Sequence, residues 1–212
     1  MTSNIYACTQ LLFDTPNFED LGFGAPERDI LQSGIALHLA AYFGLTEAPN
    51  GVAIVRFLLD NGADVNSKDN YGRTPLGYAS EDYYGGIVRF FWGKAADFES
   101  KGPGDRRPLF YAEHQGSEAV AQLLLAKGAD LELKDNRGWT PLFCALKQRR
   151  GESTVQLLLE NGADVKSEDN NGRTPLSYVR SLRPEAKVRL LLEKGADIQS
   201  KDESHKASLL AS

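Results

Sequence analysis

The side chains best suited to chemistry in this sequence are basic and aromatic residues that precede a series of Pro-Leu pairs. Seven of these nine positions carry positive charge, although the whole chain has a net charge of −5. Arginine forms paired hydrogen bonds with carboxylates, and Tyr and Trp add contact area when binding excludes water. The row predicts a site for an acidic extended segment of a partner protein, with solvated turn residues as the alternative. The nine positions are Lys68, Tyr71, Arg73, Lys101, Arg106, Lys134, Arg137, Trp139 and Arg173.

No residue pattern in the sequence predicts catalysis or metal binding. The three histidines, His38, His114 and His205, lie far apart in the chain. The two cysteines, Cys8 and Cys144, are 136 residues apart, and neither has a neighbour at metal-ligand spacing. The Gly-x-Ser-x-Gly nucleophile motif and the phosphate-binding Gly-x-x-x-x-Gly-Lys-Ser/Thr motif are both missing from the sequence. We therefore expect no catalytic residues, no metal and no cofactor, and we do not expect an enzyme.

Bulk composition favours a soluble intracellular protein, cytoplasmic or nuclear. The chain has 212 residues, of which 42% are hydrophobic and 25% charged. Its acidic balance gives no general reason to bind nucleic acid or an anionic membrane. No apolar run approaches the roughly 20 residues that span a bilayer, and the first residues lack the basic and apolar regions of a secretory signal. With only two cysteines, a disulfide framework is not expected.

The elements that must position the basic row recur along the chain at a fixed interval. The Pro-Leu pairs begin at Pro75, Pro108, Pro141 and Pro175. Each pair is followed by a segment that ends at an aspartate, and one such segment also precedes the first pair. These aspartates are Asp64, Asp97, Asp130, Asp164 and Asp197. The period is therefore 33, 33, 34 and 33 residues. A period of this size is typical of a stacked solenoid and not of a globule with a central active site.

Within one period, 69–101, the sequence predicts a turn followed by two helices. Thr74 can cap a first helix that runs from Pro75 to about Asp82, because its hydroxyl can accept a backbone N–H. The residues expected to face inward on the second helix are Ile87, Val88, Phe90 and Phe91. The corresponding leucine blocks of the later periods are too apolar for one helix pair to bury, so neighbouring periods must cover them.

The recurring pattern resembles the ankyrin repeat. It comprises Asp-x-x-Gly-x-Thr-Pro-Leu, an Ala in the first helix, Leu-Leu in the second and Gly-Ala-Asp-Val at the end, over about residues 33–202. The resemblance implies an all-α ankyrin-repeat solenoid, with antiparallel helix pairs joined by projecting β-hairpin finger loops and stacked into an L-shaped, gently curved array. It also implies a protein-interaction module, acting as an adaptor, scaffold or inhibitor.

The domain boundaries follow from the period. We expect five repeats over 33–68, 69–101, 102–134, 135–168 and 169–201, followed by a truncated sixth repeat or C-terminal cap at 203–212. Residues 1–32 do not follow the period. Two roles remain open for them, a cap on the first repeat or an arm that binds a second partner.

In a protein that resembles ankyrin repeats, partners meet the finger tips and the exposed side of the first helices. Trp139 is the strongest single candidate, because a tryptophan on a projecting turn has little reason to be there for folding alone. His38 occupies the position where such repeats carry a structural histidine. The predicted partner-binding residues are Tyr71, Arg73, Arg106, His114, Arg137, Trp139 and Arg173. Further groove residues are Tyr42, Glu81, Asp82, Gln115, Lys147 and Gln148.

The stretch 83–107 departs most from the pattern. Ala95 stands where the other repeats have glycine, and Arg107 stands where they have the capping threonine. Its aromatic residues indicate either relaxed packing in a diverging copy or a specialised contact point. Two further functions therefore stay open: a targeting subunit of an enzyme complex that uses 1–32 for a second partner, or a small-molecule-binding or catalytic ankyrin protein that uses this stretch.

Overall fold

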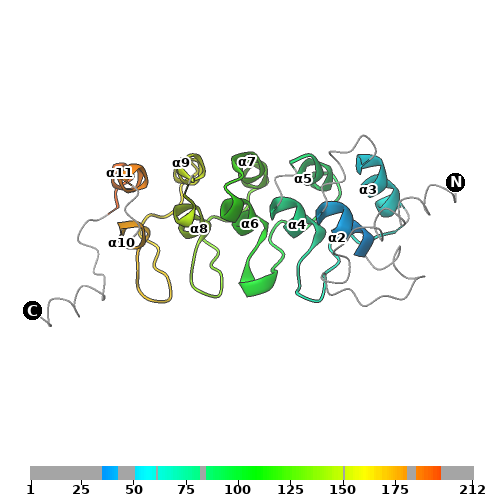
Figure 1. Ribbon diagram of the computed structural model, residues 1–212, viewed down its shortest axis with the longest axis horizontal. Coiled ribbons are helices and arrows are strands. Elements are labelled where there is room, and N and C mark those ends of the chain that lie inside the picture. The colour runs from blue at the N-terminus through cyan, green and yellow to red at the C-terminus, as the bar shows by residue number, and fades with distance from the viewer. Residues whose placement is uncertain are drawn as a thin grey trace, which may run out of the picture. The chain divides into compact units, whose positions relative to one another are not determined.

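The computed structural model describes residues 35–42, 51–60, 62–81, 85–149, 151–180 and 185–196. The predictions for 1–32, Asp82, Tyr83, Tyr84 and 203–212 fall outside the described residues. The chain divides into two compact units, Met1–Pro103 and Gly104–Ser212, which are described separately. In the described part of both units the regular elements are helices, and no strand is formed (Figure 1).

The first unit contains two pairs of helices. Helix α2 (Ile35–Tyr42) packs against α3 (Gly51–Asp60), and α4 (Pro75–Glu81) packs against α5 (Gly85–Trp92). Contacts between α2 and α4 join one pair to the next. The bounds of α4 agree with the first helix that the sequence predicts from Pro75 to about Asp82.

The second unit contains three such pairs. They are α6 (Pro108–Gln115) with α7 (Glu118–Ala126), α8 (Pro141–Lys147) with α9 (Glu152–Glu160), and α10 (Pro175–Arg180) with α11 (Glu185–Glu193). Helices α6, α8 and α10 form one row of this unit, and α7, α9 and α11 form the other (Figure 1). The stacked helix pairs confirm the predicted all-α repeat fold, but the described finger loops are turns without the β-strands that the expected hairpins would have.

Local chemistry sets where the first helices begin. Pro75, which lacks a backbone N–H, is the first residue of α4, where that donor would have no partner inside the helix. The hydroxyl oxygen of Thr74 accepts a hydrogen bond from the N–H of Gly77 at 3.3 Å. Thr174 accepts the same bond from Ser177 at 3.3 Å before α10. The predicted capping by threonine is confirmed at these two positions.

Left-handed residues end the second helices. Gly62, Gly128, Gly162 and Gly195 have φ between +82° and +93°. Glycine adopts this conformation without steric cost, which explains its recurrence at this position. Ala95 takes the same role with φ of 56°, so the departure seen in the sequence forces an alanine into a conformation that suits glycine.

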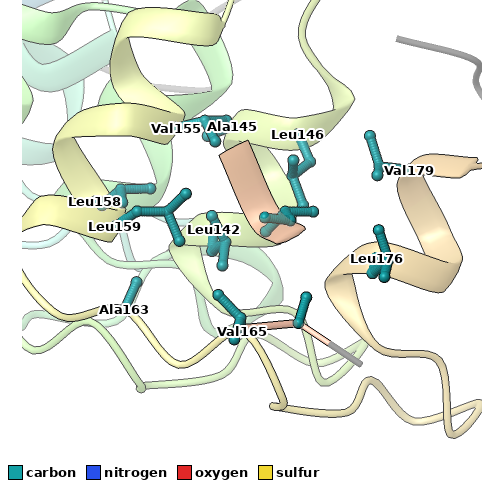
Figure 2. Packing of buried hydrophobic residues seen from close by; sticks show 12 residues of the cluster. Leu142, Ala145, Leu146, Val155, Leu158, Leu159, Ala163, Val165, Leu176 and Val179 are labelled. Atoms are coloured by element: carbon teal, nitrogen blue, oxygen red, sulfur yellow. The ribbon is translucent and has the colours of Figure 1, made fainter. Parts of the chain in front are cut away.

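The core of the second unit is shared between successive helix pairs (Figure 2). Leu158 of α9 is fully buried, and its cluster includes Leu142 of α8, Leu176 of α10 and Leu191 of α11. Each leucine-bearing helix thus completes its burial against a neighbouring pair. This arrangement confirms that the leucine blocks need adjacent repeats to cover them.

A buried lysine joins the last helix pair to the one before it. Lys187 of α11 is 1% exposed, and its Nζ donates hydrogen bonds to the carbonyl oxygens of Ala145 at 3.2 Å and Leu146 at 3.1 Å. It also donates to the carbonyl oxygen of Gln148. These carbonyls lie at the end of α8, and that of Ala145 also accepts the backbone N–H of Gln148 at 3.2 Å, so Lys187 adds a second tie that holds the end of α8 in place.

Candidate functional site

The finger loops are the turns that precede the first helices, and three of them share one construction. In the finger at 69–74, Asp69 Oδ1 accepts the backbone N–H groups of Tyr71 and Arg73, both at 2.8 Å. Asp135 and Asp169 bind the equivalent N–H groups in the fingers at 135–140 and 169–174. One aspartate carboxylate therefore fixes each loop and aims the side chains that follow it.

The finger of the first unit presents an exposed tyrosine. Tyr71 is 62% exposed, as its predicted binding role requires. Arg73 forms an ion pair with Glu81 and lies with its guanidinium carbon 4.7 Å from the centre of the Tyr78 ring. Burial and a hydrogen bond to Asp69 raise the pKa of Tyr78, so this phenol stays neutral. The charge of Arg73 is thus already balanced inside its own repeat.

His38 has the structural role expected for it. Its side chain is 2% exposed, and its ring Nε2 forms a hydrogen bond of 2.9 Å with the carbonyl oxygen of Arg73. The ring also meets Tyr78 edge-on, with 5.9 Å between ring centres. The contact joins α2 to the finger of the next repeat and leaves His38 out of the candidate site.

In the irregular finger at 102–107, both arginines interact with groups of this chain. Arg106 Nε lies 3.6 Å from Asp135 Oδ2, a carboxylate whose side chain is wholly buried. Arg107 is buried, and its Nη1 donates to the carbonyl oxygens of Asp105 at 3.3 Å and Lys134 at 3.4 Å. The guanidinium of Arg107 thus links this loop to the backbone of Lys134, while α6 begins without a side-chain cap.

The finger at 169–174 also balances its own charge. Arg173 donates from Nε and Nη2 to Asp169 Oδ2 at 2.9 and 2.6 Å, and its guanidinium lies 5.3 Å from the centre of the Tyr178 ring. Burial raises the pKa of Asp169, but the hydrogen bonds from Arg173 and the loop outweigh it, and the pKa is lowered overall. The carboxylate is therefore held in its charged form.

The prediction that Trp139 projects into solvent is wrong. Its side chain is only 7% exposed, because it stacks on Phe143 with 6.2 Å between ring centres and an interplanar angle of 17°. Tyr178 meets the same indole at 5.2 Å, and Phe110 and Cys144 complete the cluster. The finger loop places the Trp139 side chain against the first helices, so this side chain contributes to folding as well as to any site.

The described aromatic residues of the stretch 83–107 are buried or half-buried, and none is exposed. Phe91 is fully buried, and Phe90 and Trp92 are half-buried on α5. Phe90 meets Phe91 at 6.5 Å between ring centres, which is ordinary helix packing. The described part of this stretch thus supports relaxed packing and not an exposed aromatic contact point.

Two cations lie against the buried tryptophan. The guanidinium carbon of Arg137 is 5.6 Å from the centre of the Trp139 ring, and the Nζ of Lys147 is 5.9 Å from it. Both side chains are exposed. Within the described ranges, neither cation forms an ion pair with a carboxylate. We call Arg137, Trp139 and Lys147 the tryptophan site.

The structure brings together only part of the predicted set. Arg137 and Trp139 share the tryptophan site, and Arg173 reaches the same aromatic cluster through Tyr178. Tyr71 and Arg73 belong to the other compact unit, and His114 is half-buried in the last turn of α6. The residues that support the indole were missed, although Phe110 and Phe143 both follow the Pro-Leu pair at the same offset.

The groups at the tryptophan site are suited to non-covalent binding. Burial raises the pKa of the Cys144 thiol to about 12, so it is not a nucleophile at neutral pH. The described residues contain no group of His, Cys, Asp and Glu side chains that could hold a metal ion. An exposed arginine and lysine on an aromatic surface are suited to binding anions.

Comparison with known proteins now decides the family. A family model described as ankyrin repeats (3 copies) matches residues 3–102, 37–135, 82–169 and 109–202. The chain belongs to the ankyrin repeat family. A search of curated proteins found no relative of this ankyrin repeat protein. Across its described ranges, no helix has the length and apolar character needed to cross a membrane.

Proposed function

We propose that this ankyrin repeat protein binds a partner protein non-covalently, through its finger loops and the exposed side of its first helices. It would serve as an adaptor, a scaffold or an inhibitor. The single observation that supports this function best is the tryptophan site, where Arg137 and Lys147 have no carboxylate partner in the described part of the chain. The predicted binding residues remain Tyr71, Arg73, Arg106, His114, Arg137, Trp139 and Arg173.

The proposed roles differ among these residues. Tyr71 would supply exposed aromatic contact area, since it is 62% exposed on a rigid loop. Arg137 would bind anionic groups directly. Trp139 would act from below as a fixed support for Arg137 and Lys147, a role that suits a side chain buried against Phe143.

The partner that fits this surface is a protein with an acidic extended segment. Arginine binds carboxylates through two parallel hydrogen bonds, and the indole provides a low-dielectric surface beside the cations. Nucleic acid fits less well because the net charge of the chain is −5.

The mechanism is the display of a preorganised surface. The Asp135 carboxylate fixes the loop that carries Arg137, and Lys187 fixes the end of the helix that carries Lys147. Association therefore orders few additional groups, which limits the entropy lost on binding.

Affinity capture from a native cell lysate tests the proposal. The Arg137→Ala variant is compared with Arg189→Ala, which removes an exposed arginine from the second-helix row of the same unit. We expect proteins that the wild-type chain captures to be lost with Arg137→Ala and kept with Arg189→Ala. Capture that both variants retain equally would remove the finger loops from the interface.

A further inference from the structure

The cations of the finger loops differ in how far they are free to meet a partner. Three arginines that the sequence places in one basic row are already paired with carboxylates of this chain. The pairs are Arg73 with Glu81, Arg106 with Asp135, and Arg173 with Asp169. Two lysines of the row instead donate to backbone carbonyl oxygens: Lys68 to Lys101 at 3.4 Å and Lys134 to Glu168 at 2.8 Å. Three of the seven positive charges of the row are therefore balanced by carboxylates of this chain, and two further head groups are held by backbone carbonyl oxygens.

The tryptophan site differs from the three paired arginines of the row. Arg137 and Lys147 are exposed and, among the described residues, form no ion pair with a carboxylate. Both head groups lie against one indole, at 5.6 and 5.9 Å from its centre. Two like charges held beside one ring repel each other, and negative charge brought to this ring by a partner relieves the repulsion.

The support beneath the two cations is rigid. Trp139 is stacked on Phe143 and held at its edge by Tyr178, with ring-centre distances of 6.2 and 5.2 Å. The indole replaces water beside each cation, which strengthens the interaction of that cation with an anion. Two cations that form no ion pair among the described residues are therefore held against one fixed aromatic support.

We propose that the tryptophan site recognises a phosphorylated side chain within the partner's acidic segment. This inference rests on the proposed function and adds the identity of the group bound at one position. A phosphate monoester carries about −1.5 to −2 charge at pH 7 on three acceptor oxygens. It matches the two cations of the tryptophan site better than a single carboxylate does, because its charge balances both of theirs, whereas a carboxylate balances one. Arg137 would donate two parallel hydrogen bonds, and Lys147 would act as a point charge.

A peptide library with a fixed central residue and randomised flanking residues tests this proposal on the full chain. The central residue is phosphoserine, Glu or Ser, and binding is measured by fluorescence anisotropy. We expect the phosphoserine pool to bind at least about tenfold more tightly than the Glu pool. We also expect its affinity to rise between pH 5 and pH 7, as the second phosphate proton with a pKa of about 6 is lost, whereas the Glu pool changes little over this range.

Matched variants connect the effect to the site. Arg137→Ala and Lys147→Ala should each weaken phosphoserine binding by at least about fivefold, because each removes a charge-assisted hydrogen-bond donor. Arg189→Ala and Lys194→Ala remove exposed cations from α11 and from the residue that follows it, and should leave binding unchanged. Thermal unfolding of all four variants shows whether the fold is kept.

Each outcome distinguishes this inference from the broader function. Equal binding of the phosphoserine and Glu pools, still lost in Arg137→Ala, would overturn phosphate recognition and support binding of an acidic segment. Phosphoserine binding that survives both Arg137→Ala and Lys147→Ala would overturn the assignment of the site. No binding of the phosphoserine pool would also overturn the inference, while the lysate capture decides the broader function independently. Competition by inorganic phosphate at the same concentration as the peptides would indicate a site for free phosphate instead.

Discussion

Lys187 donates a hydrogen bond from its Nζ to the carbonyl oxygen of Leu146 at 3.1 Å, although the two residues belong to different repeats. The bond lies at the end of α8, one residue before the exposed Lys147. Gly151 closes the same joint, because a Cβ at that position would lie 2.6 Å from the carbonyl oxygen of Ala145. A buried ammonium and a glycine thus set the end of the helix that carries one cation of the tryptophan site.

Replacing Lys187 with methionine should destabilise the second unit. The substitution keeps the aliphatic stem but removes the ammonium donor from the carbonyl oxygens of Ala145, Leu146 and Gln148, although Ala145 keeps the backbone N–H of Gln148. The loss of this buried donor costs about 1–3 kcal/mol. The free energy of unfolding from urea titrations measures the effect. Lys194→Met, at an exposed position after α11, is the control and should change stability little. A Lys187→Met variant as stable as wild type would show that the buried ammonium is dispensable.

Glu113 makes the stability of the second unit depend on pH. Its side chain on α6 is fully buried, and neither carboxyl oxygen has a well-formed hydrogen bond among the described residues. Burial raises its pKa well above the ordinary value, with an opposing contribution from the Thr154 hydroxyl. The native state therefore keeps a proton that the unfolded chain releases above about pH 4.3. The free energy of unfolding should fall as pH rises from there toward the native pKa, by at most about 1.4 kcal/mol per pH unit.

Glu113→Leu should remove this dependence. Leu146 occupies the same position of the next repeat and is 1% exposed, so the site accepts leucine in a closely related setting. The free energy of unfolding of the variant, minus that of wild type, should be larger at pH 8 than at pH 5 by at least about 1 kcal/mol. Urea unfolding at the two pH values measures this difference. Glu118→Gln, on the exposed face of α7, is the control and should show the same pH dependence of stability as wild type. If Glu113→Leu also kept the wild-type pH dependence, Glu113 would not be its source.

Ala95→Gly should stabilise the first unit. Ala95 has φ of 56°, whereas the other repeats place glycine at this helix end. Removing the Cβ relieves the left-handed strain, and we expect a net gain of about 0.5–1 kcal/mol in the free energy of unfolding.

The reciprocal change in the second unit is the control for Ala95. Gly162 has φ of 93°, and a Cβ built there meets no atom within 4 Å. Gly162→Ala should therefore cost about 1 kcal/mol through backbone conformation alone. Equal stability of both variants and wild type would show that the left-handed position carries no strain.

Trp139→Ala should destabilise the second unit by about 3–5 kcal/mol, because it removes a large side chain from a packed aromatic cluster. Trp139→Phe should cost less, since it keeps a ring against Phe143. Chemical unfolding followed by circular dichroism measures both. A cost below about 1 kcal/mol for the alanine variant would restore the exposed position that the sequence suggests.

The repeat sequence predicts the elements well because their signals are local. Thr74 and Pro75 act within one turn of chain, and the left-handed glycines act at single residues. Burial of Trp139 was not predictable in the same way, because Phe110 and Tyr178 come from the neighbouring repeats. The neutralisation of Arg73 and Arg173 likewise depends on side-chain geometry and not on position in the motif.

Two features of the second unit did have a sequence signal. Glu113 aligns with Leu146 when the repeats are placed in register on their Pro-Leu pairs, which marks it as a carboxyl at a core position. Lys147 falls on the groove side of its first helix by the same register. The register does not show which charges are paired. The seven basic positions look equivalent in the sequence, because their partners are known only from the structure.

Amide hydrogen exchange of the full chain, measured with and without a captured partner, shows where the partner binds. We expect partner binding to slow exchange in the finger at 135–140 and in α8, with little change in α9 and α11. Protection confined to α9 and α11, with the finger at 135–140 unchanged, would contradict a binding surface on the finger loops and first helices.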